Sequence, residues 1–250
     1  MDDPRYALYT SPPRPGALVL FLHGGRSEAL EAPPWPNLPG LRMRPFVRAV
    51  ARACADLRPA VAQVRYRHRG WNGERADAAR DAGAALASLV ERLGPVPVVL
   101  VGHSMGGRAA LRLAAHPGVR GVVGLAPWCP AGEPVEHLAD RRLVLLHDEG
   151  DRMTDPGGTW SLVARARDAG ASACGVVLTG SDHAMLRRAG LWHTLATAVT
   201  RGLLVPEAMP PAVAAALTAP AGAAPGPLTA GDVLRASAPP PARHRPPASP

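Results

Sequence analysis

The 250-residue sequence predicts an α/β fold, with a mainly parallel central sheet and helices on both of its faces. Two observations lead to this prediction. Short continuous apolar runs, typical of strands buried on both faces, alternate along the chain with stretches of helical periodicity. Hydrophobic residues also make up 47% of the chain, which is enough for a large core. Strands that alternate with helices in this way form a parallel sheet covered on both sides.

Each element can be assigned from its own pattern. Strands are expected at the six apolar runs 17–22, 61–66, 96–101, 121–126, 143–146 and 175–178, with an edge strand at 5–10. The first helix is expected to begin at Pro45, since proline suits a first turn, and to carry an apolar stripe from Phe46 to Leu57. Further helices are expected at residues 78–93, 105–115, 159–169 and 186–203.

The composition of the chain changes near Val205. The 45 residues from 206 to 250 hold 12 of the 29 prolines and 14 alanines, but only five charged residues. Such a segment buries too little apolar surface to offset its ordering entropy. We therefore expect a folded domain at residues 1–205 and a Pro/Ala-rich, disordered tail at residues 206–250, in which only residues 229–237 favour a helical turn or two.

Arginine alone supplies the positive side-chain charge of the chain. All 28 residues counted as Lys or Arg are arginines, and against 20 acidic residues they give a formal net charge of +8. A basic chain is compatible with nucleic-acid binding. However, the chain also lacks isoleucine, which together with the missing lysine is typical of GC-rich codon usage. The tail adds only +1, from three arginines against two acidic residues. We expect no nucleic-acid partner.

Nothing in the sequence indicates a membrane or a metal. No run approaches the roughly 20 apolar residues that a membrane helix needs. The acidic start, Met1-Asp2-Asp3-Pro4, lacks the basic and then apolar layout of a signal peptide. Three widely spaced cysteines indicate neither a disulfide framework nor a zinc site. We expect a cytoplasmic protein with no membrane partner, no metal and no cofactor, whose oligomeric state the sequence leaves open.

The strongest chemical signal is the segment Gly102-His103-Ser104-Met105-Gly106. It follows the apolar run that ends at Val101 and opens into a helical pattern, which is the strand–turn–helix setting that a G-x-S-x-G nucleophile requires. Small residues two positions to either side of the serine allow a sharp, strained turn. Its hydroxyl then projects above the sheet edge beside a helix N-terminus, which favours developing negative charge.

With this motif the chain resembles the α/β-hydrolase family, over nearly all of residues 5–204. The resemblance implies an α/β-hydrolase fold with an acid after a later strand and a histidine after the last. The segment His147-Asp148-Glu149-Gly150-Asp151 is similar to the family's H-G-x-x-D segment, which makes Asp151 the orienting acid. Asp148 stands where glycine is usual in this segment and remains a rival to Asp151 for the role of the acid. Asp155 is a weaker rival for the same role. His183, after the strand at 175–178, matches the catalytic histidine.

The resemblance also implies an oxyanion hole. Leu22-His23-Gly24-Gly25 is similar to the family's H-G-G element, so the backbone N–H groups of Gly25 and Met105 are expected to hold the oxyanion. His23 is expected to brace that loop rather than to catalyse. Only some sixteen residues, 127–142, are available for a cap between the strand that follows the nucleophile helix and the acid-bearing strand, so minimal or no cap is expected.

Residues beside the predicted catalytic edge are candidates for substrate binding. They are Arg26, Trp35, Trp71 and Trp128, although each tryptophan is equally compatible with core packing and arginine with a solvated surface. Arg26, or alternatively Arg69, is a candidate to recognise a carboxylate or phosphate on the substrate.

These residues together predict a serine hydrolase that cleaves a carboxylic ester through an acyl-enzyme, with the triad Ser104, Asp151 and His183 and a small-molecule acyl substrate. A thioesterase with the same triad is the main alternative. The alternative of another class is a non-catalytic binding protein on a hydrolase scaffold, which the complete set of site residues disfavours.

Overall fold

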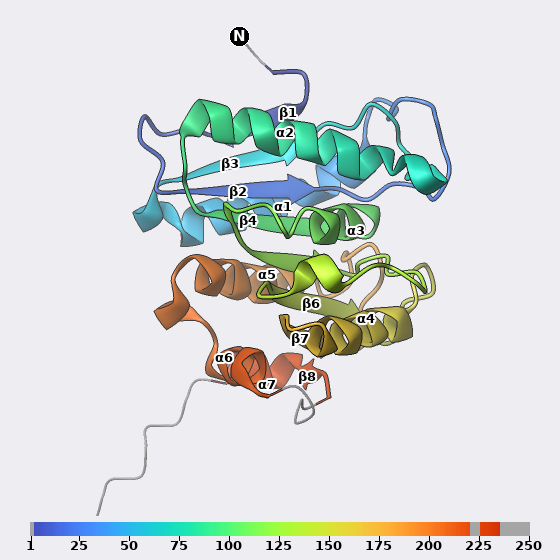
Figure 1. The fold of residues 1–250 in the computed structure, drawn as a ribbon, viewed down its shortest axis with the longest axis vertical. Helices are drawn as coiled ribbons and strands as arrows, with labels where there is room; N and C mark the ends of the chain where they lie inside the picture. Colours follow the sequence, from blue (N-terminus) through green and yellow to red (C-terminus); the bar gives the residue numbers. More distant parts are fainter. Residues whose placement is uncertain (1–2, 221–225, 236–250) are drawn as a thin grey trace, which may run out of the picture.

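A computed structural model describes residues 3–220 and 226–235 and shows one eight-stranded sheet with the order β1-β3-β2-β4-β5-β6-β7-β8 (Figure 1). The strands are β1 Tyr6–Thr10, β2 Ala17–Leu22, β3 Pro59–Val64, β4 Val98–His103, β5 Val119–Leu125, β6 Arg142–Asp148, β7 Ser172–Leu178 and β8 Leu228–Thr229. Strand β1 pairs antiparallel with β3, and all other neighbours are parallel. The predicted parallel sheet and edge strand are confirmed.

Helices cover both faces of the sheet (Figure 1). They are α1 Leu38–Ala53, α2 Asp77–Leu93, α3 Met105–Arg112, α4 Pro156–Asp168, α5 Ala189–Leu204, α6 Pro211–Thr218 and α7 Ala230–Leu234. Buried residues of α2, α3 and α4 form one core layer, and those of α1, α5, α6 and α7 form the other. The central strands β2, β3 and β4 are buried along their whole length, which explains why their sequences are mostly apolar.

The first helix begins earlier than the sequence predicts. Asn37 accepts a hydrogen bond from the backbone N–H of Gly40 and caps α1, whose first turn contains Pro39. Pro45, predicted as the first helical residue, lies inside the helix instead. The apolar residues on both sides of Pro45, including Met43 and Phe46, are buried against the sheet. This packing outweighs the hydrogen bond that an internal proline removes.

The predicted boundary at residue 205 is wrong for the described part of the C-terminal segment. Helix α6 packs its buried residues Val213, Ala216 and Leu217 into the core layer of α1 and α5, and β8 pairs with β7. Two of the prolines that suggested disorder begin helices, where they cost no hydrogen bond: Pro206 begins a 3₁₀ turn and Pro211 begins α6. Residues 221–225 and 236–250, also assigned to the tail, lie outside the described residues.

Leu217→Ala is expected to test this contribution of the C-terminal segment to stability. Leu217 is buried, so its truncation is expected to lower the free energy of unfolding by about 2–3 kcal/mol, within the range for buried leucines. The exposed Leu234 on α7 serves as the matched control, for which a change within about 0.5 kcal/mol is expected. Urea unfolding measures both. Equal effects of the two substitutions would show that α6 does not pack on the core.

The connection in which a cap domain could be inserted leaves the sheet at the edge that carries the carboxyl ends of the parallel strands. The connection from β5 to β6 contains a single 3₁₀ turn, Glu136–Leu138, and no cap domain is inserted there. Within residues 3–220 and 226–235, no helix combines the length and the apolarity needed to cross a membrane.

Candidate active site

Ser104 occupies a strained turn between β4 and α3. Its backbone lies at φ 54° and ψ −120°, a conformation that L-residues rarely adopt. The flanking glycines make the turn possible. A Cβ on Gly102 would lie 2.3 Å from the carbonyl oxygen of Gly106, and a Cβ on Gly106 would lie 2.2 Å from that of Leu22. The G-x-S-x-G spacing is therefore a steric requirement of this turn.

Asp151 is the acid that contacts His183. Its Oδ2 accepts a hydrogen bond from Nδ1 of His183 at 2.7 Å, which joins the loop after β6 to the loop after β7. Asp148, the rival acid, is used otherwise, because its two oxygens accept from the backbone N–H groups of Gly150 and Ser181. Asp155 caps helix α4. Of the three acids considered from the sequence, the structure places Asp151 against the histidine.

The carboxylate of Asp151 accepts five hydrogen bonds, one of which comes from the hydroxyl of Thr154 to Oδ2. Oδ2 accepts from His183 and from Nε2 of the buried His147 at 3.1 Å, while Oδ1 accepts from the backbone N–H groups of Met153 and Thr154. Burial alone raises the pKa of this carboxyl, but the hydrogen bonds from the two histidines and from Met153 outweigh it and hold the pKa well below its usual range. Asp151 is therefore ionised whenever the fold is intact near neutral pH.

His183 contacts His103, the residue directly before Ser104. Nε2 of His103 donates to the backbone carbonyl of His183 at 2.9 Å, and the two imidazole rings are 4.9 Å apart. Burial lowers the pKa of His103 to about 3, so this imidazole is neutral. No hydrogen bond joins Ser104 Oγ to His183 in the part of the chain that the structure describes. Such bonds often tighten only when substrate binds.

The loop after β2 reaches the start of α3, as an oxyanion hole requires. A Cβ on Gly25 would lie 2.4 Å from the Met105 side chain and 2.4 Å from the Arg69 carbonyl oxygen, so only glycine fits there. Among the described residues, the backbone N–H groups of Gly25 and Met105 have no hydrogen-bond acceptor.

His23 braces this loop, as the sequence suggests. It is buried, its Nδ1 lies 2.7 Å from the carbonyl oxygen of Gly24, and its Nε2 accepts from the side-chain amide of Asn37 at 3.1 Å. Burial lowers the pKa of His23 to about 4. The neutral imidazole thus ties the loop to the residue that caps α1.

The four residues considered for substrate binding differ in their burial and in their contacts. Arg26 is exposed directly after Gly25, and Trp35 is 96% exposed. Trp71 is buried in the core, so its assignment as a substrate contact is wrong. Trp71 instead packs edge-on against the half-buried Trp128, and the guanidinium of Arg108 lies 4.0 Å from the centre of the Trp71 ring and 4.5 Å from that of Trp128. These contacts account for the buried position of Trp71.

Sequence reasoning missed two residues that support Asp151. His147 is fully buried between Asp151 and the hydroxyl of Thr159. Its position at the end of a strand in the same segment as the acid was a usable signal. Thr154 places Oγ1 3.0 Å from Asp151 Oδ2 and 3.2 Å from His183 Nδ1. A threonine in a loop carries no such signal.

A doubly covered parallel sheet with a strained serine after a central strand, followed in order by an acid and a histidine, defines the α/β-hydrolase class. A family model described as an alpha/beta hydrolase domain matches residues 42–202, and the chain belongs to this family. The protein is therefore a hydrolase by family. Comparison with curated protein sequences gave no match.

Solved structures share this fold. A serine hydrolase without a lid from Xanthomonas campestris is 17% identical, with a TM-score of 0.54 over 78% of this chain and 88% of that chain. A thermophilic esterase from Thermogutta terrifontis, solved with propionate bound, is 15% identical with a TM-score of 0.60 over 81% and 89%. An alpha-beta serine hydrolase homologue from Coxiella burnetii is 14% identical with a TM-score of 0.57 over 77% and 89%.

Proposed function

We propose that the protein is a serine esterase that hydrolyses a carboxylic ester of a small molecule through an acyl-enzyme. The observation that carries this proposal is the 2.7 Å hydrogen bond between Asp151 and His183, made beside the strained turn of Ser104. A binding protein on a hydrolase scaffold has no need of a buried carboxylate that orients a histidine beside such a serine.

The chemical steps follow from this arrangement. His183 removes the proton from Ser104 Oγ, which attacks the acyl carbonyl, while Asp151 fixes the imidazole tautomer and stabilises the imidazolium. The N–H groups of Gly25 and Met105 bind the oxyanion as it forms. Collapse of the tetrahedral intermediate expels the alcohol, which takes its proton from His183. Water, with His183 again as the base, then hydrolyses the acyl-enzyme and releases the acid.

The lack of a cap domain between β5 and β6 favours esters over carrier-bound acyl thioesters. Thioesterases that share this serine motif usually hold long acyl chains beneath a helical lid, and the β5–β6 connection forms no lid here. The esterase from Thermogutta terrifontis was solved with propionate, a short carboxylic acid, and its fold is shared by this chain. These observations support a short or compact acyl group.

A matched substrate series tests the choice of an ester. p-Nitrophenyl esters and acyl-CoA thioesters of the same acyl lengths are compared by kcat/KM on the wild-type protein. The ester of each pair is expected to be hydrolysed faster, with the highest values at short acyl chains. Faster turnover of the acyl-CoA partners would instead identify a thioesterase, and no turnover of either class above the Ser104→Ala background would favour the binding-protein alternative.

Arg26 is proposed to recognise an anionic group on the substrate. It is exposed directly beside the oxyanion donor Gly25 and forms no ion pair within residues 3–220 and 226–235. Arg26→Ala is expected to lower kcat/KM about tenfold for hemisuccinate esters and to leave neutral butyrate esters unchanged. Kinetics on both series provide the measurement, and equal losses on both would reject a role in charge recognition.

A further inference from the structure

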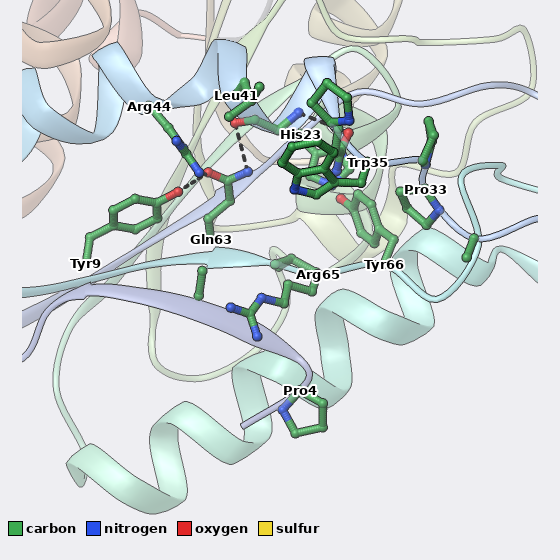
Figure 2. Close-up of a pocket in the computed structure, with 17 residues that line it drawn as sticks. Pro4, Tyr9, His23, Pro33, Trp35, Leu41, Arg44, Gln63, Arg65 and Tyr66 are labelled. Atoms are coloured by element: carbon green, nitrogen blue, oxygen red, sulfur yellow. Dashed lines mark hydrogen bonds between the residues drawn. The ribbon is translucent and has the colours of Figure 1, made fainter. Parts of the chain in front are cut away.

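An open groove lies on the other side of the oxyanion loop, between the β1–β3 edge of the sheet and the start of α1 (Figure 2). Its volume is about 770 Å³, which is ample for a small organic molecule. His23 and Asn37 line it, whereas Ser104, Asp151 and His183 do not. The groove is therefore separate from the candidate active site and shares with it only the loop that His23 braces.

The charge of the groove is wholly positive. Two arginines line it, Arg44 from α1 and Arg65 from the residue that follows β3, and the lining contains no aspartate or glutamate. Both side chains are exposed, and neither forms an ion pair or a side-chain hydrogen bond in the described part of the chain. Seven of the 26 arginines within residues 3–220 and 226–235, Arg108 and Arg201 among them, form ion pairs with acidic residues. The groove thus offers two uncompensated cations to an anion.

Aromatic and proline rings form the walls. Trp35 (Figure 2) is 96% exposed, the highest fraction among the exposed large hydrophobic side chains of the described residues, and it lines the groove together with its chain neighbours Pro34 and Pro36. The rings of Tyr9 and Tyr66 line the same space. A large apolar ring left in water costs free energy that a stacked ligand recovers. These walls favour a ligand with a flat aromatic body.

The floor of the groove is a fixed polar surface. Gln63 is buried, its Oε1 accepts from the Tyr9 hydroxyl at 3.1 Å, and its Nε2 donates to the carbonyl oxygen of Gly40 at 3.1 Å (Figure 2). Asn37 is held by His23 and by the backbone of α1. Because these side chains already have partners, the floor is formed before a ligand binds, which lowers the cost of binding.

We propose that this groove is a second ligand site, which binds a small aromatic carboxylate. Arg44 and Arg65 pair with the carboxylate, and Trp35 stacks on the aromatic ring. The site does not depend on hydrolysis at Ser104, so the proposal goes beyond the esterase activity.

Isothermal titration calorimetry with 2-naphthoate and its neutral analogue 2-naphthylmethanol tests the proposal on the full chain. The wild-type protein is expected to bind 2-naphthoate at least about tenfold more tightly than the alcohol, because only the acid pairs with arginine. The double variant Arg44→Gln, Arg65→Gln is expected to weaken 2-naphthoate binding by about 10- to 100-fold, and Trp35→Ala by about tenfold. All three side chains are exposed, so these substitutions are compatible with folding.

Matched variants locate the binding. Arg48→Gln, one turn further along α1 and outside the groove, and Leu30→Ala, exposed in the same loop as Trp35, are expected to leave binding unchanged. Arg26→Ala, beside the catalytic edge, is also expected to have no effect. The proposal is overturned if the acid and the alcohol bind equally, if neither binds, or if Arg26→Ala weakens binding while the groove variants do not. The last result would place the ligand at the active site as a product analogue.

Discussion

Ser104→Ala is expected to abolish ester hydrolysis, with a loss of kcat on the order of 10⁴- to 10⁶-fold, as when other triad nucleophiles are removed. The side chain of Ser104 supplies the only nucleophile at the turn after β4, so the acyl-enzyme cannot form without it. The fold is expected to persist, because alanine fits the same small volume between Gly102 and Gly106. Hydrolysis of p-nitrophenyl butyrate and a thermal melt measure the two effects.

Ser161→Ala is the matched control for this substitution. Ser161 is exposed on α4, so full activity and an unchanged melting temperature are expected. Hydrolysis retained by Ser104→Ala, in protein purified free of host esterases, would contradict the assignment of the nucleophile. A lowered melting temperature with lost activity would instead point to a damaged turn, and Ser104→Gly would then separate the two effects.

Asp151→Asn is expected to lower kcat by about 10⁴-fold, the size of effect seen when the acid of a serine–histidine–acid triad becomes an amide. Oδ2 of Asp151 accepts from both His147 and His183. An asparagine placed there must turn its NH₂ group either toward these donors or toward the backbone N–H groups of Met153 and Thr154. In either case the imidazole of His183 loses its fixed tautomer or its position.

Asp148→Asn is the comparison that decides between the two acids. Asp148 binds only the backbone N–H groups of Gly150 and Ser181, so its substitution is expected to lower stability more than catalysis, with kcat within about tenfold of the wild type. Steady-state kinetics and urea unfolding of both variants give the result. A larger loss of kcat in Asp148→Asn than in Asp151→Asn would reverse the assignment.

The parts of the structure that the sequence predicts best are those that one local pattern determines. The continuous apolar runs locate β2 to β7 because strands buried on both faces tolerate few polar residues. The serine turn is equally local, since the glycines at 102 and 106 are required by backbone atoms a few residues away or on the neighbouring strand. Chain order then restricts the acid and the histidine to two loops.

The parts that the sequence predicts poorly depend on long-range packing. Pro211 and the alanines after it resemble a disordered tail, yet Val213 and Leu217 complete a core layer that includes α1, far away in the chain. Trp71, in the loop after β3, packs against Arg108, which lies on α3. The choice between Asp148 and Asp151 depends on where the loop after β7 returns. No local pattern contains these contacts.

Intact-protein and peptide mass spectrometry after treatment with a fluorophosphonate probe tests the nucleophile directly. Such probes react with a serine hydroxyl only where a neighbouring base activates it. The protein is expected to gain one probe mass, located on the peptide that contains Ser104, with labelling lost in Ser104→Ala and strongly reduced in a His183→Ala variant. Labelling of a different residue, or no labelling of the folded wild-type protein, would contradict the proposed serine hydrolase.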